Sequence, residues 1–275
     1  MRASSTDGVE LEVHDLDGDG PTLLIAHATG MCGGAYLPLA AGLRSRFHVW
    51  ALDFRAHGRS TVPASGELAW PGMIDDVLTV VDALGDGPVA AIGHSMGGAC
   101  LMGAELRRPG TVARAFLFEP IIVPSGFDVP GGPNPMAAAA RRRRPGFPSR
   151  ADALYRYASR PPLGTWRADA LHAYVEHGFT ELPDGTVALA CTPEHEARVF
   201  EGSGKPLIRD MGAVSTPVVV AYGARDLGPS PASFAPLVAE ALPHGEGRRY
   251  AHLDHFGPFQ DPDTLAADAL AFLAP

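Results

Sequence analysis

Short apolar runs alternate with segments of helical periodicity along most of the chain. Residues 89–92 form an unbroken apolar run of strand length, whereas residues 67–84 carry apolar side chains at helical spacing. Runs this short are typical of strands that helices cover on both faces. The alternation predicts an α/β fold whose sheet is doubly wound and mostly parallel. Further strands are expected at 9–16, 22–26, 48–52, 112–118, 216–222 and 248–251, and further helices at 36–43, 98–106, 230–242 and 264–273.

A different pattern occupies the middle of the chain. Proline and glycine become dense over residues 124–135, and no apolar run of the buried-strand type lies between residues 121 and 216. This composition predicts a mainly helical segment that interrupts the α/β core. Its helices are expected at 150–159, 166–176 and 192–202, with a small hairpin or loop at 181–189.

The turn after the apolar run at 89–92 carries the main candidate chemistry. Residues 93–97 form the pattern G-x-S-x-G, with Ser95 at its centre, and small residues that favour a buried helix follow. A serine on so tight a turn is crowded by neighbouring chains, and Gly93 and Gly97 remove the side chains that would clash. Because a helix begins just beyond Ser95, the free backbone N–H of Met96 is a natural donor to negative charge that develops there.

This strand, turn and helix resemble the nucleophile turn of the α/β-hydrolase superfamily, and two other segments agree with the resemblance. Residues 27–30 (H-A-T-G) and 53–60 (D-F-R-A-H-G-R-S) are similar to superfamily loops that usually have glycine at the positions of Ala28 and Ala56. The resemblance implies that Thr29 donates a backbone N–H to the oxyanion. It also implies a helical cap, or lid, inserted after the sixth family strand. We place this cap at residues 125–210 and the core at residues 1–124 and 211–275.

A serine nucleophile needs a base and a carboxylate that orients the base. Functional groups in a parallel α/β sheet gather at the carboxyl ends of strands. Asp226 follows the strand at 216–222, and His255 follows the last strand. The order Ser95, Asp226, His255 is the order of a Ser-His-Asp triad in α/β-hydrolases.

Other residues compete for these roles. Glu119 follows the strand at 112–118 and is the alternative acid, because some members of the resembled superfamily keep their acid near that position. His252 shares a loop with His255, but we assign it to loop packing, and we expect His94 to point away from the Ser95 hydroxyl. The remaining polar residues of the two superfamily-like loops are interpreted as structural: His27, Asp53, Arg55 and His57.

Composition narrows the function further. The 275 residues include 31 acidic and 22 basic side chains, and the formal charge of −9 argues against a general role in nucleic-acid binding. Three cysteines without a C-x-x-C pattern indicate free thiols in a reducing compartment. Residues 1–15 show no signal peptide, and no apolar run is long enough to span a membrane. We therefore expect a cytoplasmic protein with a small-molecule substrate; the sequence does not predict its oligomeric state.

The arginines at 141–144 have two interpretations. They could bind an acidic partner or an anionic group of the substrate at the cap. They could also form a solvated helix end, where cations offset the helix dipole, and we favour this second interpretation.

These residues together predict a serine hydrolase that needs neither a metal nor an organic cofactor. It would cleave a carboxylic ester, a lactone or a thioester through an acyl-enzyme. The alternatives are hydrolysis of a carbon–carbon bond in a diketone with the same triad, a receptor-like protein with slow turnover, or a biosynthetic member of the same fold.

Overall fold

The computed structural model describes residues 1–85, 87–127, 134–224 and 231–274. Within these residues the main sheet has eight strands in the order β1-β2-β4-β3-β5-β6-β10-β11. Strand β2 pairs antiparallel with β1 and β4, and all other neighbours pair parallel. The doubly wound, mostly parallel sheet is therefore confirmed. The strands are β1 (Arg2–Ser4), β2 (Glu10–Asp15), β3 (Thr22–Ala26), β4 (His48–Leu52), β5 (Val89–His94), β6 (Val112–Phe118), β10 (Val218–Gly223) and β11 (Gly245–Tyr250).

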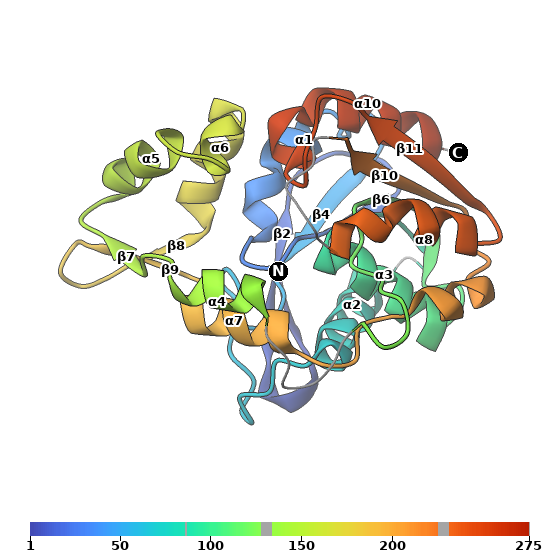
Figure 1. The fold of residues 1–275 in the computed structure, drawn as a ribbon, viewed down its shortest axis with the longest axis horizontal. Coiled ribbons are helices and arrows are strands. Elements are labelled where there is room, and N and C mark those ends of the chain that lie inside the picture. The colour runs from blue at the N-terminus through green and yellow to red at the C-terminus, as the bar shows by residue number, and fades with distance from the viewer. Residues whose placement is uncertain (86, 128–133, 225–230, 275) are drawn as a thin grey trace.

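Helices cover both faces of this sheet (Figure 1). Strand β3 shows why, because Leu24 and Ala26 are buried in one core cluster while Leu23 and Ile25 are buried in the other. A strand that is apolar at every position needs cover on both sides. Helices α2 (Trp70–Leu84), α3 (Met96–Arg107) and α8 (Ala235–Ala241) pack on the first face, and α1 (Leu37–Ala41) and α10 (Pro262–Leu273) on the second.

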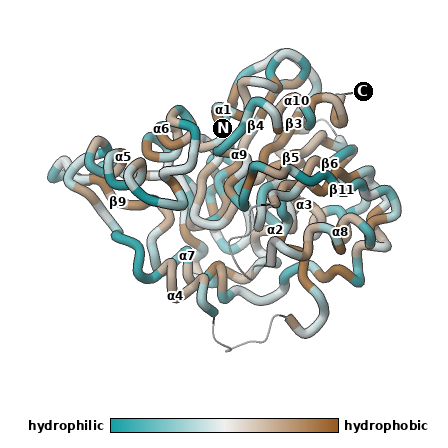
Figure 2. The backbone as a smooth tube through the Cα atoms, turned by 45° about the horizontal axis from the view of Figure 1, so that its top comes forward, coloured by the Kyte–Doolittle hydropathy of each residue, from teal (hydrophilic) through white to brown (hydrophobic). Residues whose placement is uncertain are grey.

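The chain leaves the main sheet between β6 and β10, and we call residues 119–217 the inserted segment. Its described part contains four α-helices and a separate antiparallel sheet of order β7-β9-β8. The segment extends to one side of the core, at the left in Figure 1, and Figure 2 shows the same arrangement from another direction. Its elements are α4 (Pro135–Arg141), β7 (Gly146–Phe147), α5 (Arg150–Ala158), α6 (Ala168–His177), β8 (Phe179–Glu181), β9 (Val187–Leu189) and α7 (Pro193–Glu201).

Several elements differ from the sequence-based expectation. The last strand begins at Gly245, not at residue 248, because β11 pairs with all of β10 as an edge strand. Its sequence G-E-G-R-R-Y is mostly exposed, so no apolar run marks it. The helix expected at 36–43 begins as a 3-10 turn, η2 (Gly33–Tyr36), and continues as α1. The small hairpin expected at 181–189 is confirmed, because β8 and β9 pair antiparallel from Phe179 to Leu189. Strand β7, which has two residues, was not expected.

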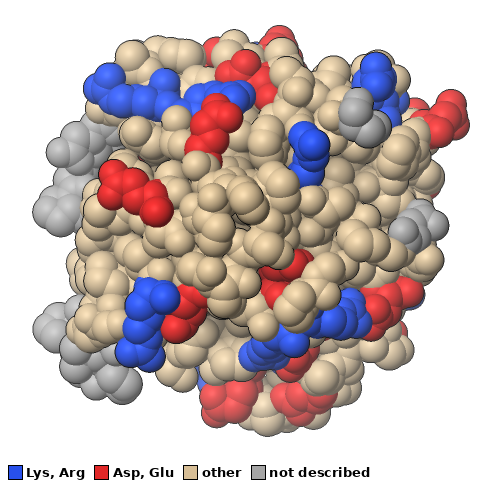
Figure 3. All heavy atoms as spheres, turned by 90° about the vertical axis from the view of Figure 1, so that its right-hand side faces the viewer, with Lys and Arg blue, Asp and Glu red and all other residues tan. Residues whose placement is uncertain are grey.

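Charges of both signs are mixed on the molecular surface. On the face drawn in Figure 3, basic and acidic side chains often lie next to one another. Oppositely charged side chains of the described residues also form ion pairs, for example Arg248 with Glu246 and Arg108 with Asp82. Among the described residues, no helix combines the length and the apolar character needed to cross a membrane.

Candidate active site

Ser95 occupies a strained turn between β5 and α3. Its backbone angles are φ 55° and ψ −117°, which a non-glycine residue rarely adopts. A Cβ atom on Gly97 would lie 2.1 Å from the carbonyl oxygen of Ala26, and one on Gly93 would lie 2.5 Å from the Cα of Gly98. The close approach of neighbouring backbone therefore requires both glycines. This agrees with the crowding expected from the G-x-S-x-G pattern.

The hydroxyl of Ser95 meets the imidazole of His255. His255 Nε2 lies 3.1 Å from Ser95 Oγ, and His255 Nδ1 lies 2.6 Å from Oε2 of Glu119. A carboxylate can only accept, so Nδ1 carries the proton and donates it to Glu119. In the neutral imidazole the other nitrogen, Nε2, then has a free lone pair that faces the hydroxyl. Ser95, His255 and Glu119 are thus joined in one line of hydrogen bonds.

Glu119 reaches this position because β6 lies between β5 and β10. The backbone N–H of Ser95 donates to the carbonyl of Phe118 at 3.0 Å, which sets the end of β6 beside the serine turn. Glu119 itself has a positive φ of 45°, and its Oε1 accepts the backbone N–H of Gly223 at 2.8 Å. This hydrogen bond links the end of β6 to the end of β10.

Asp226 lies outside the described residues, so the structure does not place the carboxylate that we preferred from the sequence. The carboxylate hydrogen-bonded to His255 is that of Glu119, the alternative acid. Nδ1 carries a single hydrogen, and Glu119 accepts it. The chain order of the joined residues is Ser95, Glu119, His255.

The two residues expected to supply oxyanion donors contact one another, and one of them, Met96, directly follows Ser95. Met96 is the first residue of α3, so its backbone N–H has no carbonyl partner within the helix. The side chain of Thr29 contacts that of Met96, with Oγ1 at 3.4 Å from Sδ. The loop that carries Thr29 is fixed one residue earlier, where the N–H of Ala28 donates to the hydroxyl of Tyr36 at 3.1 Å.

The polar residues of the neighbouring loops hold backbone in place, in agreement with the structural interpretation. His27 donates from Nδ1 to the carbonyl of Ala28 at 2.8 Å and accepts the N–H of Phe54 on Nε2 at 3.0 Å. Complete burial lowers the pKa of His27 to about 3, so its imidazole is neutral. Burial likewise lowers the pKa of His57 to about 4.

The charged residues of the same loops are paired. The buried guanidinium of Arg55 donates to the carboxylate of Asp76 at 2.6 Å. Asp53 accepts the backbone N–H of Gly33 at 2.7 Å and that of Arg59 at 2.8 Å. These contacts tie Arg55 to α2 and Asp53 to the backbone of Gly33 and Arg59, in agreement with the structural interpretation.

The two rival histidines lie where the sequence suggested. His252 is 54% exposed and pairs with Asp261 at 2.9 Å. His94 points away from the Ser95 hydroxyl, with Nδ1 at 2.7 Å from the hydroxyl of Tyr36. Its Nε2 contacts the main-chain carbonyl of His255 at 2.7 Å, a contact that sequence reasoning missed. No local signal could have found it, because 161 residues separate the two positions.

The arginine run divides into separate contacts. Arg141, at the end of α4, forms ion pairs with Glu194 at 2.9 Å and with Glu201 at 2.6 Å. Arg143 pairs with the buried Glu196 and donates to the Tyr174 hydroxyl at 2.7 Å. Arg141 connects α4 to α7, and Arg143 connects the residues just after α4 to α7. The preferred interpretation of the run as a solvated helix end is therefore wrong for Arg143.

The buried pair lies close to the serine site. A Cβ atom on Gly30 would lie 2.6 Å from Oε1 of Glu196 and 3.2 Å from Nη1 of Arg143. Gly30 directly follows Thr29, so the inserted segment packs against the loop that carries this expected oxyanion donor. No local sequence pattern indicates this contact, because the residues lie far apart in the chain.

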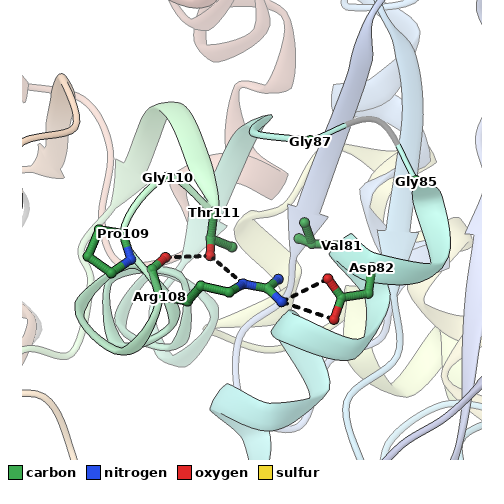
Figure 4. A pocket seen from close by; sticks show the side chains of 8 residues that line it. All are labelled: Val81, Asp82, Gly85, Gly87, Arg108, Pro109, Gly110 and Thr111. Carbon is green, nitrogen blue, oxygen red and sulfur yellow. Dashed lines mark hydrogen bonds and ion pairs between the residues drawn. The ribbon is translucent and has the colours of Figure 1, made fainter.

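A separate hollow lies at the opposite end of the sheet. It has a volume of about 330 Å³ and lies where the chain enters β5 and β6, whereas Ser95 follows the end of β5. Figure 4 shows Arg108 in this hollow, paired with Asp82 at 2.8 Å. Its walls therefore belong to a different edge of the molecule from the serine turn.

Metal ligands are not grouped in the described parts of the chain. No set of three or more His, Cys, Asp or Glu residues is arranged there to hold a metal ion. The three cysteines, Cys32, Cys100 and Cys191, are free and buried.

The fold and the serine turn define the class of protein. A doubly wound sheet that carries a serine on a strained strand-to-helix turn is the architecture of α/β-hydrolases. A family model described as alpha/beta hydrolase fold matches residues 21–262, which is most of the sequence. The chain belongs to this family.

Curated relatives match over part of their length. An (E)-2-((N-methylformamido)methylene)succinate hydrolase of Acinetobacter baylyi is 33% identical over 97 residues, which cover 35% of this chain and 36% of that protein. Protein phosphatase methylesterase 1 of Rattus norvegicus is 40% identical over 92 residues, or 32% of this chain and 24% of that protein. The matches thus span about a third or less of these relatives.

Solved structures match over the whole chain. The structure of E-2-(acetamidomethylene)succinate hydrolase has a TM-score of 0.80 at 22% identity and covers 100% of this chain and 98% of its own. The enol-lactonase of Burkholderia xenovorans has a TM-score of 0.73 at 20% identity and covers 100% of both chains. At these identities the similarity shows the fold.

Proposed function

We propose that this protein is a serine hydrolase that needs no cofactor, with Ser95 as nucleophile, His255 as base and Glu119 as the acid of the triad. The observation that carries the proposal is the line of hydrogen bonds from Ser95 Oγ to His255 Nε2 and from His255 Nδ1 to Glu119. Asp226, which the chain order favoured, becomes the alternative acid. The choice of Glu119 rests on its 2.6 Å contact with Nδ1.

The proposed reaction begins when His255 takes the proton of Ser95 and Oγ attacks a carbonyl carbon. Glu119 keeps the proton on Nδ1 and stabilises the imidazolium that forms. The leaving group then takes the proton from Nε2, and an acyl-enzyme remains. Water, activated by the same imidazole, attacks this ester and releases the acid, which restores the Ser95 hydroxyl.

The backbone N–H groups of Thr29 and Met96 are the proposed donors to the oxyanion. Met96 lies at the first turn of α3, where free N–H groups and the helix dipole both favour negative charge. Each such donor is commonly worth about 3 kcal/mol in the transition state. Donors that are already in place need no reorganisation during the reaction. The hydrogen bond from the Ala28 N–H to the Tyr36 hydroxyl holds the residue next to Thr29 and so supports the proposal.

Residues 125–210, which make up most of the inserted segment, are the proposed cap. Its buried Arg143–Glu196 pair packs against Gly30 and so supports a role close to the serine. A cap in this place would select substrates by the shape of the space it leaves over Ser95. The cytoplasmic location expected from the sequence remains a prediction, and the three free thiols are compatible with it.

The proposed substrates are small carboxylic esters, lactones or thioesters. Two similar proteins support this range, one described as a methylesterase and one as an enol-lactonase. Hydrolysis of a carbon–carbon bond in a diketone is the alternative, because the same triad could perform it. Receptor-like and biosynthetic roles are further alternatives.

A probe experiment tests the nucleophile and the substrate class. A fluorophosphonate should label the wild-type protein, and Ser95→Ala should remove both the labelling and the turnover of p-nitrophenyl esters. Labelling that persists in Ser95→Ala would contradict the proposal. A panel of esters of increasing acyl length, a thioester, a lactone and a vinylogous diketone then separates the alternatives. Turnover of the diketone alone would favour carbon–carbon hydrolysis, and ligand stabilisation without any turnover would favour a receptor.

A further inference from the structure

A buried line of hydrogen bonds connects the loop of the expected oxyanion donor to the loop of the catalytic base. The N–H of Ala28 contacts the Tyr36 hydroxyl at 3.1 Å, and this hydroxyl contacts His94 Nδ1 at 2.7 Å. His94 Nε2 in turn contacts the main-chain carbonyl of His255 at 2.7 Å. Tyr36 and His94 are each 1% exposed, so water does not replace these contacts.

The two ends of the line fix the direction of every bond. A backbone N–H can only donate and a carbonyl can only accept. His94 must therefore carry its proton on Nε2 and donate to His255, which leaves Nδ1 as the acceptor of the Tyr36 hydroxyl. The hydroxyl accepts from Ala28 at the same time. Only one tautomer of a neutral His94 satisfies all three contacts.

The surroundings keep His94 neutral and in place. Burial, together with the nearby imidazole of His255, lowers the pKa of His94 well below its usual value. The ring centroids of His94 and His255 are 5.1 Å apart. Phe259 packs against both Tyr36 and His94, at centroid distances of 4.9 and 5.8 Å. A charged His94 would donate from Nδ1, and the Tyr36 hydroxyl would then have to turn its own hydrogen away from His94.

We propose that Tyr36 and His94 are positioning residues. They hold the loop of Ala28 and Thr29 and the loop of His255 in fixed positions relative to each other and to Ser95. Neither side chain touches the reacting atoms. They act through the position of Ala28, next to Thr29, and through the main chain of His255. Because His255 must stay within hydrogen-bond distance of Ser95 Oγ, a shift of its backbone misplaces the base. This inference rests on the proposed hydrolase function for its kinetic test.

The chain offers matched variants for that test. In His94→Gln the side-chain amide N–H can reach the place of Nε2 and keep the bond to the His255 carbonyl. In His94→Asn the amide oxygen replaces Nδ1 for the Tyr36 hydroxyl, but the donor to His255 is lost. Tyr36→Phe removes the hydroxyl and keeps the ring. His252→Asn is the control, an exposed histidine from the His255 loop that lies outside the line.

The measurement is the turnover of p-nitrophenyl acetate, with kcat normalised to the active sites that a fluorophosphonate titrates. This normalisation separates misplaced catalytic groups from unfolded protein. We expect kcat per titrated site to fall about tenfold in Tyr36→Phe and about a hundredfold in His94→Asn. His94→Gln should retain more activity than His94→Asn, KM should change by less than about twofold in each, and His252→Asn should match the wild type. Equal activity of the two His94 variants, or a change confined to KM, would overturn the proposal.

A second measurement does not depend on activity or on the variants folding. Nitrogen-15 NMR of the wild-type histidines at pH 7, with His94 assigned through bonds to its backbone, reports the tautomer directly. We expect His94 to be neutral and protonated on Nε2. A charged His94, or a proton on Nδ1, would refute the inference even in an active enzyme. If the wild type shows neither labelling nor turnover, the proposed function is refuted. The tautomer of His94 would still test the proposed line of hydrogen bonds in that case.

Discussion

The carboxylate of Glu119 and the imidazole of His255 meet at 2.6 Å, although 136 residues separate them in the chain. The other oxygen of the same carboxylate accepts the N–H of Gly223 at 2.8 Å. Glu119 is 6% exposed, so both of its oxygens are held away from most of the solvent. One side chain therefore ties the ends of β6 and β10 to the loop that carries the proposed base.

The first prediction concerns the identity of the acid. Glu119→Gln preserves the shape of the side chain but cannot stabilise the imidazolium or hold its tautomer in the same way. We expect kcat for p-nitrophenyl acetate to fall roughly 10³- to 10⁴-fold, as when the carboxylate of a serine triad becomes an amide. Steady-state kinetics with titrated active sites would measure the loss.

The comparison variant for this prediction is Asp226→Asn. If Glu119 is the acid, this variant should keep kcat within a few-fold of the wild type. A large loss in Asp226→Asn combined with a small loss in Glu119→Gln would reverse the assignment and restore the acid that the sequence favoured.

The acid was harder to predict than the nucleophile for a physical reason. Ser95 is marked by its own neighbours, because Gly93 and Gly97 are required by local crowding. His255 follows the last strand, and functional groups gather at the carboxyl ends of strands in a parallel sheet. Glu119 can contact His255 because β6 lies between β5 and β10 and because Glu119 has a positive φ. Neither the strand order nor this backbone angle can be read from the position of a carboxylate in the sequence.

The same distinction applies to the fold. The apolar runs identified β3, β5, β6 and β10, because helices cover these strands on both faces of the sheet. Strand β1 has only three residues, and α4 has seven, most of them alanine. Elements this short give too few positions for a periodic pattern, and their place depends on partners far along the chain, such as α7 for α4.

The second prediction tests the crowding at the serine turn. In Gly97→Ala the new methyl group would meet the Ala26 carbonyl oxygen at 2.1 Å, so backbone must move. We expect a loss of more than about 3 kcal/mol in the free energy of unfolding, measured by urea denaturation. Gly212→Ala is the matched control, because nothing lies within 4 Å of its added Cβ. Similar stability of the two variants would show that the turn can relax.

The third prediction separates two arginines of one run. Arg143 has a side-chain exposure of 20% and pairs with Glu196, which is 9% exposed. Arg143→Met leaves that carboxylate buried without its partner, and we expect a loss of about 3–5 kcal/mol in the free energy of unfolding. Adding Glu196→Gln should recover part of it, since the buried charge is then removed. Denaturant unfolding of the single and double variants would measure the coupling.

Arg141 provides the contrast within the same run. Its side chain is 40% exposed, and its partners Glu194 and Glu201 are more exposed still. Solvent screens such pairs, so Arg141→Met should leave the unfolding midpoint nearly unchanged. If Arg141→Met destabilises the protein as much as Arg143→Met, burial does not explain the difference in their roles.

The last prediction concerns the dependence of stability on pH. Burial lowers the pKa of His27 to about 3, that of His57 to about 4 and that of His94 well below its usual value. In the unfolded chain these histidines bind protons as the pH falls through about 6.5, whereas the folded protein binds them only at lower pH. The free energy of unfolding should therefore fall between pH 7 and 5, with a limiting slope of about 1.4 kcal/mol per pH unit for each buried histidine.

The variant His57→Asn tests the contribution of one of these histidines. Its amide retains a donor for the Arg55 carbonyl, which His57 Nδ1 contacts at 2.9 Å. Because the variant has one buried histidine fewer, the slope should decrease by about 1.4 kcal/mol per pH unit. Denaturant unfolding at a series of pH values would measure both slopes, and identical slopes in the wild type and His57→Asn would mean that His57 is not held neutral by the fold.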